Sequence, residues 1–333
     1  MKEFSAVRVE AQDGLYQCQL QSVNVDQLAS AGVLIKIVCS ALNYKDALSA
    51  SGHPGVTRNF PHTPGIDAAG IVVEDSSDQF KAGTRVIVSG FDFGMNSDGG
   101  LAEYCRVPAE WVCPCPDKLS FFNAMALGTA GITVATALNK LERQVPTAKA
   151  GDDFVISGAS GGVGSVAIKL AAARGYCVTA MSSRPDEFHR LKALGARHCI
   201  DSGSWRERSP KPLLKPEFSL GLDTLGGPML ENLLKVIRPE GALATCGMAL
   251  SEQCQTTVYP FILRGVSLLG VDSAEIPLQL KAQLWEMLSS LALDYHDLAT
   301  EVTLEQAPKI LQQMLAGKAQ GRTVVRVAEE SSS

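Results

Sequence analysis

The chain has 333 residues, 46% of them hydrophobic and 20% charged, and its formal net charge at pH 7 is −5. This length exceeds one usual hydrophobic core and predicts two domains, while a negative charge without a basic stripe argues against nucleic acid as a partner. The sequence has no apolar run of the roughly 18 residues that a bilayer span needs, and no signal-peptide pattern, so we expect a cytoplasmic protein without a membrane partner.

Residues 1–120 are predicted to be rich in strands. Short apolar segments alternate there with turns rich in glycine and proline, and the clearest are Val33–Cys39, Gly70–Glu74, Arg85–Ser89 and Ala102–Val107. Such spacing is typical of a partly open β-barrel. After this part of the chain the spacing of apolar residues changes, and Phe121–Leu141 is predicted to be a helix.

A glycine-rich turn follows the short apolar segment Asp153–Ile156. The turn, Ser157–Gly164, leads into a helix-forming run, Ser165–Arg174, and a second apolar strand, Tyr176–Met181, completes a βαβ unit. Because a strand, a glycine-rich turn and a helix N-terminus together can hold a pyrophosphate, this context indicates a dinucleotide site.

The glycines of this turn match the dinucleotide fingerprint incompletely. Aligned on G-x-G-x-x-G, the three positions are Ala159, Gly161 and Gly164, so the first glycine is an alanine. Glycine matters there because a side chain would keep the pyrophosphate away from the backbone N–H groups. We expect four residues of the turn to bind the cofactor: Ser160, Gly161, Gly162 and Val163. The alternative is a glycine-rich turn without a ligand.

The end of the second strand predicts which dinucleotide binds. An NAD-specific site usually has Asp or Glu there, whereas this chain has Ser182, Ser183 and Arg184. A carboxylate would repel a 2′-phosphate, while two hydroxyls and a guanidinium can bind one. We therefore predict that these three residues bind NADPH. The alternative is an ordinary turn in which Asp186 lies near the start of the next helix.

Strands and helices continue to alternate toward the C-terminus. Four more strands of the same sheet are predicted: His198–Ile200, Phe218–Asp223, Ala242–Cys246 and Val266–Val271. The helices predicted between them and in the tail are Pro185–Leu194, Pro228–Ile237, Leu278–Leu293 and Leu304–Leu315, and Thr323–Val327 is a last strand. Six strands in this alternation predict an α/β fold with a doubly wound parallel sheet of the Rossmann type.

The sixth of these strands, Val266–Val271, predicts an assembly. It is apolar, contains neither proline nor charge, and is expected at the edge of the sheet. An open edge of this kind promotes association unless it is covered or paired. Pairing with a two-fold copy would bury it, so we expect a homodimer joined at this strand.

The nine cysteines are interpreted as packing residues. Only Cys113 and Cys115 lie close together, and no second pair accompanies them, so their spacing predicts no zinc site. Disulfides are not expected in a chain of this size without a secretion signal. The five histidines show no pairing pattern. We therefore expect no bound metal.

Several segments resemble those of a known family. Five occur in the order expected of a medium-chain dehydrogenase/reductase of the zinc-free quinone oxidoreductase branch: Asn43–Asp46, Pro64–Gly70, Gly99–Tyr104, Gly128–Gly131 and Gly158–Gly164. Four others resemble the YhdH/YhfP subgroup of NADPH-dependent acrylyl-CoA reductases: Leu222–Gly227, Pro260–Gly265, Gly270–Ser273 and Gln320–Thr323. The resemblance covers nearly the whole chain. It implies a GroES-like catalytic domain of residues 1–124 and 272–333, with an NADP-binding Rossmann domain of residues 125–271 inserted in it.

The resemblance also implies a reaction without zinc. Where zinc alcohol dehydrogenases have a cysteine and a Gly-His-Glu segment, this chain has Asn43 and Pro64–Asp67, which offer no adequate zinc ligands. This favours hydride addition to a conjugated C=C, because the acceptor's own oxygen takes the developing charge and needs only hydrogen-bond donors. The expected reaction converts acrylyl-CoA to propionyl-CoA. NADPH-dependent reduction of diffusible quinones and a non-enzymatic NADPH-binding sensor are the alternatives.

Site residues follow from the same resemblance. Tyr44 is expected near the nicotinamide, where it donates a hydrogen bond or a proton, with a solvent proton as the alternative. Asn43 is expected to orient the cofactor amide or the substrate carbonyl, unless Asn43–Asp46 merely begins a helix. Asp67 contacts the substrate or organises buried loop backbone, and Arg58 binds an acyl-CoA phosphate or forms a salt bridge. The further cofactor contacts implied are Thr129, Leu269 and Arg322.

Overall fold

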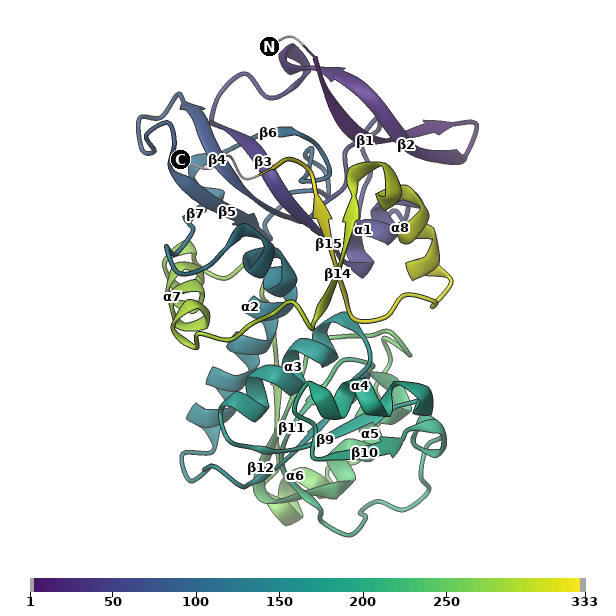
Figure 1. Ribbon diagram of the computed structural model, residues 1–333. Coiled ribbons are helices and arrows are strands. Elements are labelled where there is room, and N and C mark those ends of the chain that lie inside the picture. The colour runs from purple at the N-terminus through teal and green to yellow at the C-terminus, as the bar shows by residue number, and fades with distance from the viewer. Residues whose placement is uncertain (1–2, 330–333) are drawn as a thin grey trace. The chain divides into compact units, whose positions relative to one another are not determined.

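The computed structural model describes residues 3–329 of the chain. The chain divides into two compact units, of which unit 1 comprises Met1–Thr129 and Ala274–Ser333 and unit 2 comprises Ala130–Ser273. The middle of the chain, teal and green in Figure 1, thus forms a unit of its own between two segments that fold together. The domain bounds expected from the sequence, 124/125 and 271/272, fall a few residues before these divisions.

Unit 1 is built on strands, as predicted. Its larger sheet consists of β3 (Val33–Leu42), β4 (Asp67–Asp75), β5 (Arg85–Ser89), β6 (Tyr104–Val107), β7 (Val112–Pro114), β14 (Ala299–Thr303) and β15 (Arg322–Arg326). The strand order is β14-β15-β3-β4-β5-β7, with β6 pairing with β3, and only β14 and β15 run parallel. A separate antiparallel hairpin consists of β1 (Glu3–Gln12) and β2 (Leu15–Asn24). The pairing of β15 with β3 joins the two chain segments of unit 1.

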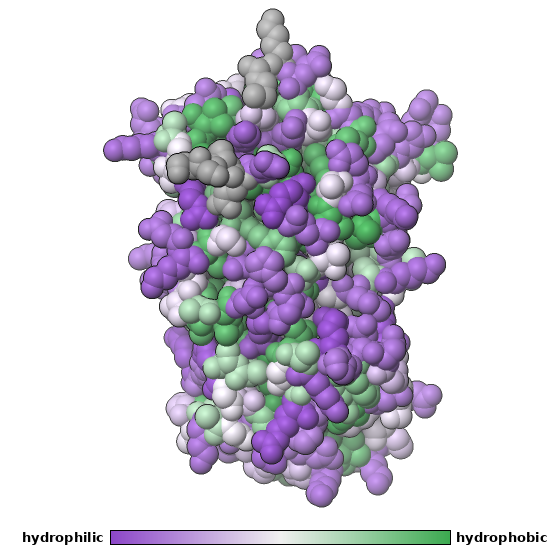
Figure 2. Space-filling model, in the orientation of Figure 1, coloured by the Kyte–Doolittle hydropathy of each residue, from purple (hydrophilic) through white to green (hydrophobic). Residues whose placement is uncertain are grey.

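The core of unit 1 follows from the period of its strands. Alternate residues of β3, Val33, Ile35 and Ile37, are buried together with Val86 and Val88 of β5. The helices of this unit are α1 (Tyr44–Ala50), α7 (Leu278–Ser290) and α8 (Ala307–Leu315), with 3₁₀ turns η1 (Val25–Gln27), η2 (Ala109–Trp111) and η5 (Leu304–Gln306). Helices α1 and α8 pack against each other. On the face drawn in Figure 2, polar side chains predominate and apolar ones lie in small groups between them.

Unit 2 contains the predicted doubly wound sheet. Its strands are β8 (Asp153–Ile156), β9 (Cys177–Ser182), β10 (His198–Asp201), β11 (Phe218–Asp223), β12 (Ile237–Thr245) and β13 (Ser267–Gly270). They are all parallel in the order β10-β9-β8-β11-β12-β13, with β13 at an edge as expected. The helical elements are α3 (Gly162–Ala173), η3 (Pro185–Glu187), α4 (Phe188–Ala193), η4 (Gly203–Arg206), α5 (Gly227–Val236) and α6 (Tyr259–Arg264). The α/β fold class predicted from the sequence is confirmed.

One long helix, α2 (Phe121–Gln144), begins in unit 1 and ends in unit 2. Gly128 interrupts its helical backbone with φ 50° and ψ −149°. Among the described residues it is the one helix long and apolar enough to span a membrane by length and composition, and 89% of its most apolar window is buried within the protein.

Some predicted elements are corrected by the structure. The helix predicted at Pro228–Ile237 ends at Val236, and β12 begins at Ile237 instead of Ala242. The sequence misled here because Pro239 and Gly241 disfavour a strand, yet Glu240 takes a positive φ of 61° and the register shifts beside it. The helix predicted at Pro185–Leu194 is divided into η3 and α4. Strands β1, β2, β7 and β14 and helix α6 were not predicted.

Candidate functional site

The glycine turn of unit 2 joins the end of β8 to the start of α3. Gly161 is the N-cap of α3 and has no side chain that could accept from the first N–H groups of the helix. These N–H groups can therefore bind an anion. A Cβ on Gly164 would lie 2.3 Å from the carbonyl oxygen of Gly158, so only glycine allows this close packing. The residues present therefore fit the pyrophosphate of a dinucleotide.

The alanine at the first fingerprint position is explained by the same geometry. The sharp turn occurs one residue earlier, at Gly158, where φ is +59° and a Cβ would lie 2.2 Å from Thr224 Oγ1. Ala159 itself is buried, and its backbone N–H donates to the carbonyl of Met181 on β9 at 3.0 Å. Its methyl group thus fills space in the core and leaves the turn open.

The three residues predicted to bind the 2′-phosphate lie at the carboxyl end of β9. Ser182 Oγ donates to Ser160 Oγ at 2.9 Å, which connects the strand end to the glycine turn, and the backbone N–H of Arg184 donates to Ser182 Oγ at 3.1 Å. Ser183 is exposed, and its Oγ accepts from Arg206 Nη2 at 3.0 Å. Hydroxyls and guanidinium groups therefore gather where an NAD-specific site would carry a carboxylate.

Two arginines of this region were missed by the sequence reasoning. Arg206, in η4 after β10, bonds Ser183, and Arg190 of α4 bonds the carbonyl oxygen of Ser160 at 3.2 Å while pairing with Glu187. A signal for Arg206 existed: β10 and β9 are parallel neighbours, so residues after their carboxyl ends lie side by side. No local motif points to Arg190.

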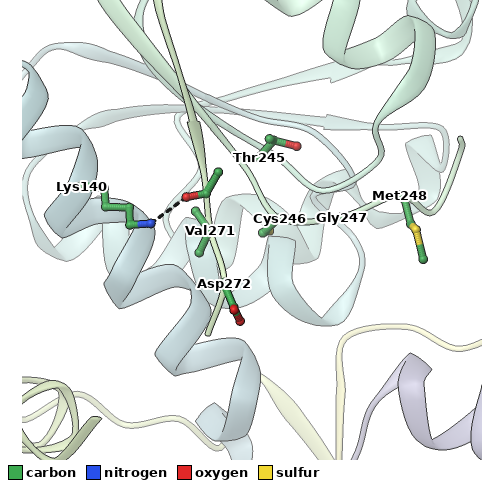
Figure 3. Close-up of a pocket in the computed structure, with 8 residues that line it drawn as sticks. Lys140, Thr245, Cys246, Gly247, Met248, Val271 and Asp272 are labelled. Atoms are coloured by element: carbon green, nitrogen blue, oxygen red, sulfur yellow. Dashed lines mark hydrogen bonds between the residues drawn. The ribbon is translucent and has the colours of Figure 1, made fainter. Parts of the chain in front are cut away.

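A cavity of about 580 Å³ lies at the carboxyl ends of β12 and β13, the edge at which sheets of this type bind ligands. Figure 3 shows its lining, with the Lys140 ammonium group donating to the carbonyl oxygen of Gly270 at 2.8 Å. Leu269, a predicted cofactor contact, is half-buried on β13 directly before Gly270. Burial raises the pKa of Cys246 in this lining to about 12, so its thiol stays protonated and is a poor nucleophile.

In unit 1, Asn43 and Tyr44 lie at the N-terminus of α1. The backbone N–H of Asn43 donates to Asp46 Oδ2 at 2.7 Å, so Asn43–Asp46 does form a helix start. The Asn43 side chain is also engaged: Nδ2 donates to Asp67 Oδ2 at 2.8 Å and Oδ1 accepts from Arg322 Nη1 at 2.8 Å. Tyr44 differs, because its side chain is 53% exposed.

Asp67 and Arg322 form a buried pair. Asp67 is 0% exposed and accepts hydrogen bonds from the backbone N–H and the hydroxyl of Thr129, and its Oδ2 lies 3.8 Å from Arg322 Nη2. This geometry favours the organising role of Asp67 over contact with a substrate. Arg322 is 3% exposed and all three of its nitrogens donate within the protein. Its contact with the cofactor stays a prediction. The hydrogen bonds of Thr129 to Asp67 likewise give it a structural partner.

Arg58 is exposed on the loop after α1. Its backbone N–H donates to Asn96 Oδ1 at 3.0 Å and its Nε donates to the carbonyl oxygen of Pro54 at 3.3 Å. The ion pairs found between residues 3 and 329 do not include Arg58, so the salt-bridge alternative gains no support.

No metal cluster is found in the part of the chain that the structure describes. Groups of three or more His, Cys, Asp or Glu side chains that could hold an ion are absent there, and none of the nine cysteines, all of which lie in the described residues, forms a disulfide. Asn43 and Asp67, which the resemblance sets at the places of zinc ligands, lie together in unit 1 with the guanidinium of Arg322 beside them.

Comparisons with known proteins find matches that cover both units. Residues 29–117 match the family model "Alcohol dehydrogenase GroES-like domain" and residues 162–290 match "Zinc-binding dehydrogenase". Among curated relatives, the Escherichia coli protein "Probable acrylyl-CoA reductase AcuI" is 38% identical, covering 97% of this chain and 99% of its own length, and the Bacillus subtilis protein "Putative quinone oxidoreductase YhfP" is 37% identical with the same coverage. The crystal structure of the Salmonella enterica yhdH oxidoreductase in complex with NADP superposes with a TM-score of 0.93 at 38% identity, covering 97% of this chain and 100% of that one.

Proposed function

Because this chain belongs to the medium-chain dehydrogenase/reductase superfamily, we propose that it is an NADPH-dependent reductase of conjugated C=C bonds that converts acrylyl-CoA to propionyl-CoA. The observation that carries the proposal is the pair of local sites described above. Unit 2 offers a pyrophosphate turn with serines and arginines for a 2′-phosphate, and in unit 1 an arginine is the cation beside Asn43 and Asp67. The first site suits NADPH, and the second favours an acceptor that needs no Lewis acid.

When bound, NADPH supplies the hydride that adds to the β-carbon of the acceptor. The backbone N–H groups at Gly161–Val163 would hold the pyrophosphate, with Ser160 beside them. Ser182, Ser183 and Arg184, and Arg206 with them, would hold the 2′-phosphate by charge-assisted hydrogen bonds. These contacts select the cofactor and fix its position before the reaction.

Tyr44 is the residue of unit 1 that we assign to the reacting end. Its exposed hydroxyl can donate a hydrogen bond to the acceptor oxygen, which gains negative charge as the β-carbon is reduced. The proton that then reaches the α-carbon comes from Tyr44 or from water, and Tyr44→Phe separates the two sources. If Tyr44 supplies it, the variant loses most of kcat, whereas a water-derived proton leaves a modest loss. Arg58, which is exposed on the neighbouring loop, is proposed to bind a phosphate of the CoA moiety.

The substrate test compares two acceptors with one enzyme preparation. NADPH consumption is measured at steady state with acrylyl-CoA and, separately, with benzoquinone. The proposal expects a far higher kcat/KM for acrylyl-CoA. The opposite preference would support the quinone reductase suggested by the name of the Bacillus relative. Tight NADPH binding without turnover of either acceptor would indicate a sensor.

The homodimer remains part of the proposal. Strand β13 ends the sheet without a neighbour on its outer side, and α6 next to it in sequence exposes Ile262 and Leu263 by 68% and 62%. An open strand beside exposed apolar side chains favours a second copy of the chain. We also propose the cytoplasm as its location, because nine cysteines that form no disulfide in the described residues suit a reducing compartment.

A further inference from the structure

Arg322 lies at the centre of a buried polar network in unit 1. We propose that Arg322 is a positioning residue for the reductase: it fixes Asn43, and through Asn43 it fixes the start of α1, which carries Tyr44. Only one part of this inference, the role of Tyr44 in the reaction, rests on the proposed function. The network itself consists of Asn43, Asp67, Thr129 and Arg322, and we call it the Arg322 network.

All three nitrogens of the Arg322 guanidinium donate, in four hydrogen bonds. Nη1 donates to Asn43 Oδ1 at 2.8 Å and to the carbonyl oxygen of Leu42 at 3.3 Å. Nε and Nη2 donate to the carbonyl oxygens of Ala126 and Met125 at 3.1 and 3.2 Å. A planar fork of five N–H donors can bridge these acceptors simultaneously, whereas a lysine ammonium is a single point. The residue type at this position is therefore set by geometry as well as by charge.

Asn43 depends on Arg322 for its orientation. Its amide oxygen faces the Arg322 donor, so its amide nitrogen must face the carboxylates, and it donates to Asp67 at 2.8 Å and to Asp46 at 3.3 Å. Turning the amide over would set an N–H against a guanidinium and an oxygen against two carboxylates. The Asn43 side chain thus has one favourable arrangement, and Arg322 imposes it.

The backbone at Asn43 fixes the position of Tyr44. It is the first residue of α1, and the carbonyl oxygen of Asn43 accepts the N–H groups of Asp46 and Ala47 at 3.0 and 3.4 Å. Within the described chain no hydrogen bond involves the Tyr44 hydroxyl, and the side chain is half exposed. Movement of Asn43 would therefore move Tyr44 without breaking a hydrogen bond of the Tyr44 side chain.

The network also accounts for the break in α2. Carbonyl groups in the last turn before Gly128 accept from Arg322, while the first N–H after it, on Thr129, donates to Asp67. A cation at a helix C-terminus and an anion at a helix N-terminus are both favourable. The break and the start of α1 are therefore held by the same ion pair, so that the network connects two elements distant in sequence.

The test is a double-mutant cycle between Arg322→Lys and Tyr44→Phe. In the wild-type background we expect Arg322→Lys to lower kcat by roughly tenfold or more, since misplacing a reacting group by about 1 Å can cost up to ~100-fold. In the Tyr44→Phe background the same change should lower kcat by about twofold or less, because the residue it positions is gone. The affinity for NADPH, measured by fluorescence titration, should stay unchanged, because the positioning role acts through Tyr44. A weakened affinity would assign Arg322 to cofactor binding and overturn the proposal. Equal losses of kcat in both backgrounds would overturn the proposal.

Arg326→Lys is the matched control, because it lies on the same strand and pairs with Glu301 near the surface. It should leave kcat and the cycle unchanged. If Arg322→Lys does not fold, Asn43→Ala tests the same chain of contacts from its other end and should show the same coupling to Tyr44→Phe.

A second readout needs no activity, so it separates failure of this inference from failure of the proposed function. Amide hydrogen exchange over Tyr44–Ala50 should be at least several-fold faster in Arg322→Lys than in Arg326→Lys. Unchanged exchange there would refute the positioning role even in a protein that reduces acrylyl-CoA. Faster exchange in a protein that turns over neither acceptor would leave the role of Arg322 on α1 intact and reject only the reductase assignment.

Discussion

Replacing Gly128 with alanine is the sharpest test of how α2 is broken around the Arg322 network. A Cβ at this position would lie 2.5 Å from Asp67 Oδ2 and 2.6 Å from Arg322 Nη2, closer than real Cβ contacts occur. The backbone cannot relieve this clash cheaply, since φ 50° with ψ −149° is a conformation that L-residues rarely adopt. The new methyl group must therefore separate the ion pair or unwind the break.

The magnitude follows from these two costs. Backbone strain contributes about 1–3 kcal/mol, and the loss of a hydrogen bond to a buried charged group contributes about 1.5–3 kcal/mol. We expect Gly128→Ala to lower the free energy of unfolding by about 2.5–6 kcal/mol. Gly317→Ala is the control, because it also has a positive φ, +67°, while nothing lies within 4 Å of the added Cβ, so it should cost about 1–2 kcal/mol.

Urea denaturation followed by tryptophan fluorescence measures the difference. Two of the three tryptophans, Trp111 and Trp285, lie in unit 1, so a Trp205→Phe background makes the signal specific for that unit. This matters because two units can unfold in separate transitions. A loss for Gly128→Ala no greater than that for Gly317→Ala would refute the reasoning, because the clash with the ion pair would then carry no cost.

Four further predictions concern the cofactor, metal, assembly and pH. Arg184→Ala should weaken NADPH binding by roughly 1.5–3 kcal/mol and leave NADH nearly unaffected in calorimetric titrations, and equal losses would reject the 2′-phosphate assignment. Chelator treatment should leave activity unchanged and elemental analysis should find well under one zinc per chain. Leu268→Asp should convert the proposed homodimer to a monomer in sedimentation experiments, and a wild-type monomer at micromolar concentration would contradict the proposed assembly. Burial raises the pKa of Asp46 from 3.8 to about 7, so the contribution of protonated Asp46 to stability is present below pH 4 and lost as the pH rises toward 7. The melting temperature of the wild type should therefore fall over this pH range, and this fall should be missing in Asp46→Asn.

The parts of the fold that repeat a local pattern were predictable. Each strand of the parallel sheet in unit 2 is a short apolar run between turn residues, and the predicted strand at 218–223 is found with the same bounds. The register of β12 was not predictable, because the bulge near Glu240 depends on pairing with β11. Helix α6 was missed because Pro260 signals a break in a sequence, although proline in the first turn of a helix is well accommodated.

The candidate site, like the fold, was only partly predictable from the sequence. The grouping of Ser182, Ser183 and Arg184 could be predicted because they stand together at the end of one strand, whereas the place of Arg206 depends on the pairing of β9 with its parallel neighbour β10. Arg322 was expected to contact the cofactor because of its neighbours in sequence. Nothing in its local sequence indicates that its acceptors come from two distant segments, 42–43 and 125–126, since such contacts depend on tertiary packing.

The pairing of β15 with β3 has a consequence for how the chain is made. Leu42 and Arg322, which are hydrogen-bonded across this pair, are 280 positions apart. At a synthesis rate of about 5–20 residues per second, roughly 15–60 s pass between the two on the ribosome. During that time residues 130–273 can complete their own sheet, while β3 has an unpaired side and Asp67 is without its cation. The sheet of unit 1 can therefore be completed only after β15 has been translated. A chain released before that point would have an incomplete sheet that is prone to association and would need chaperones.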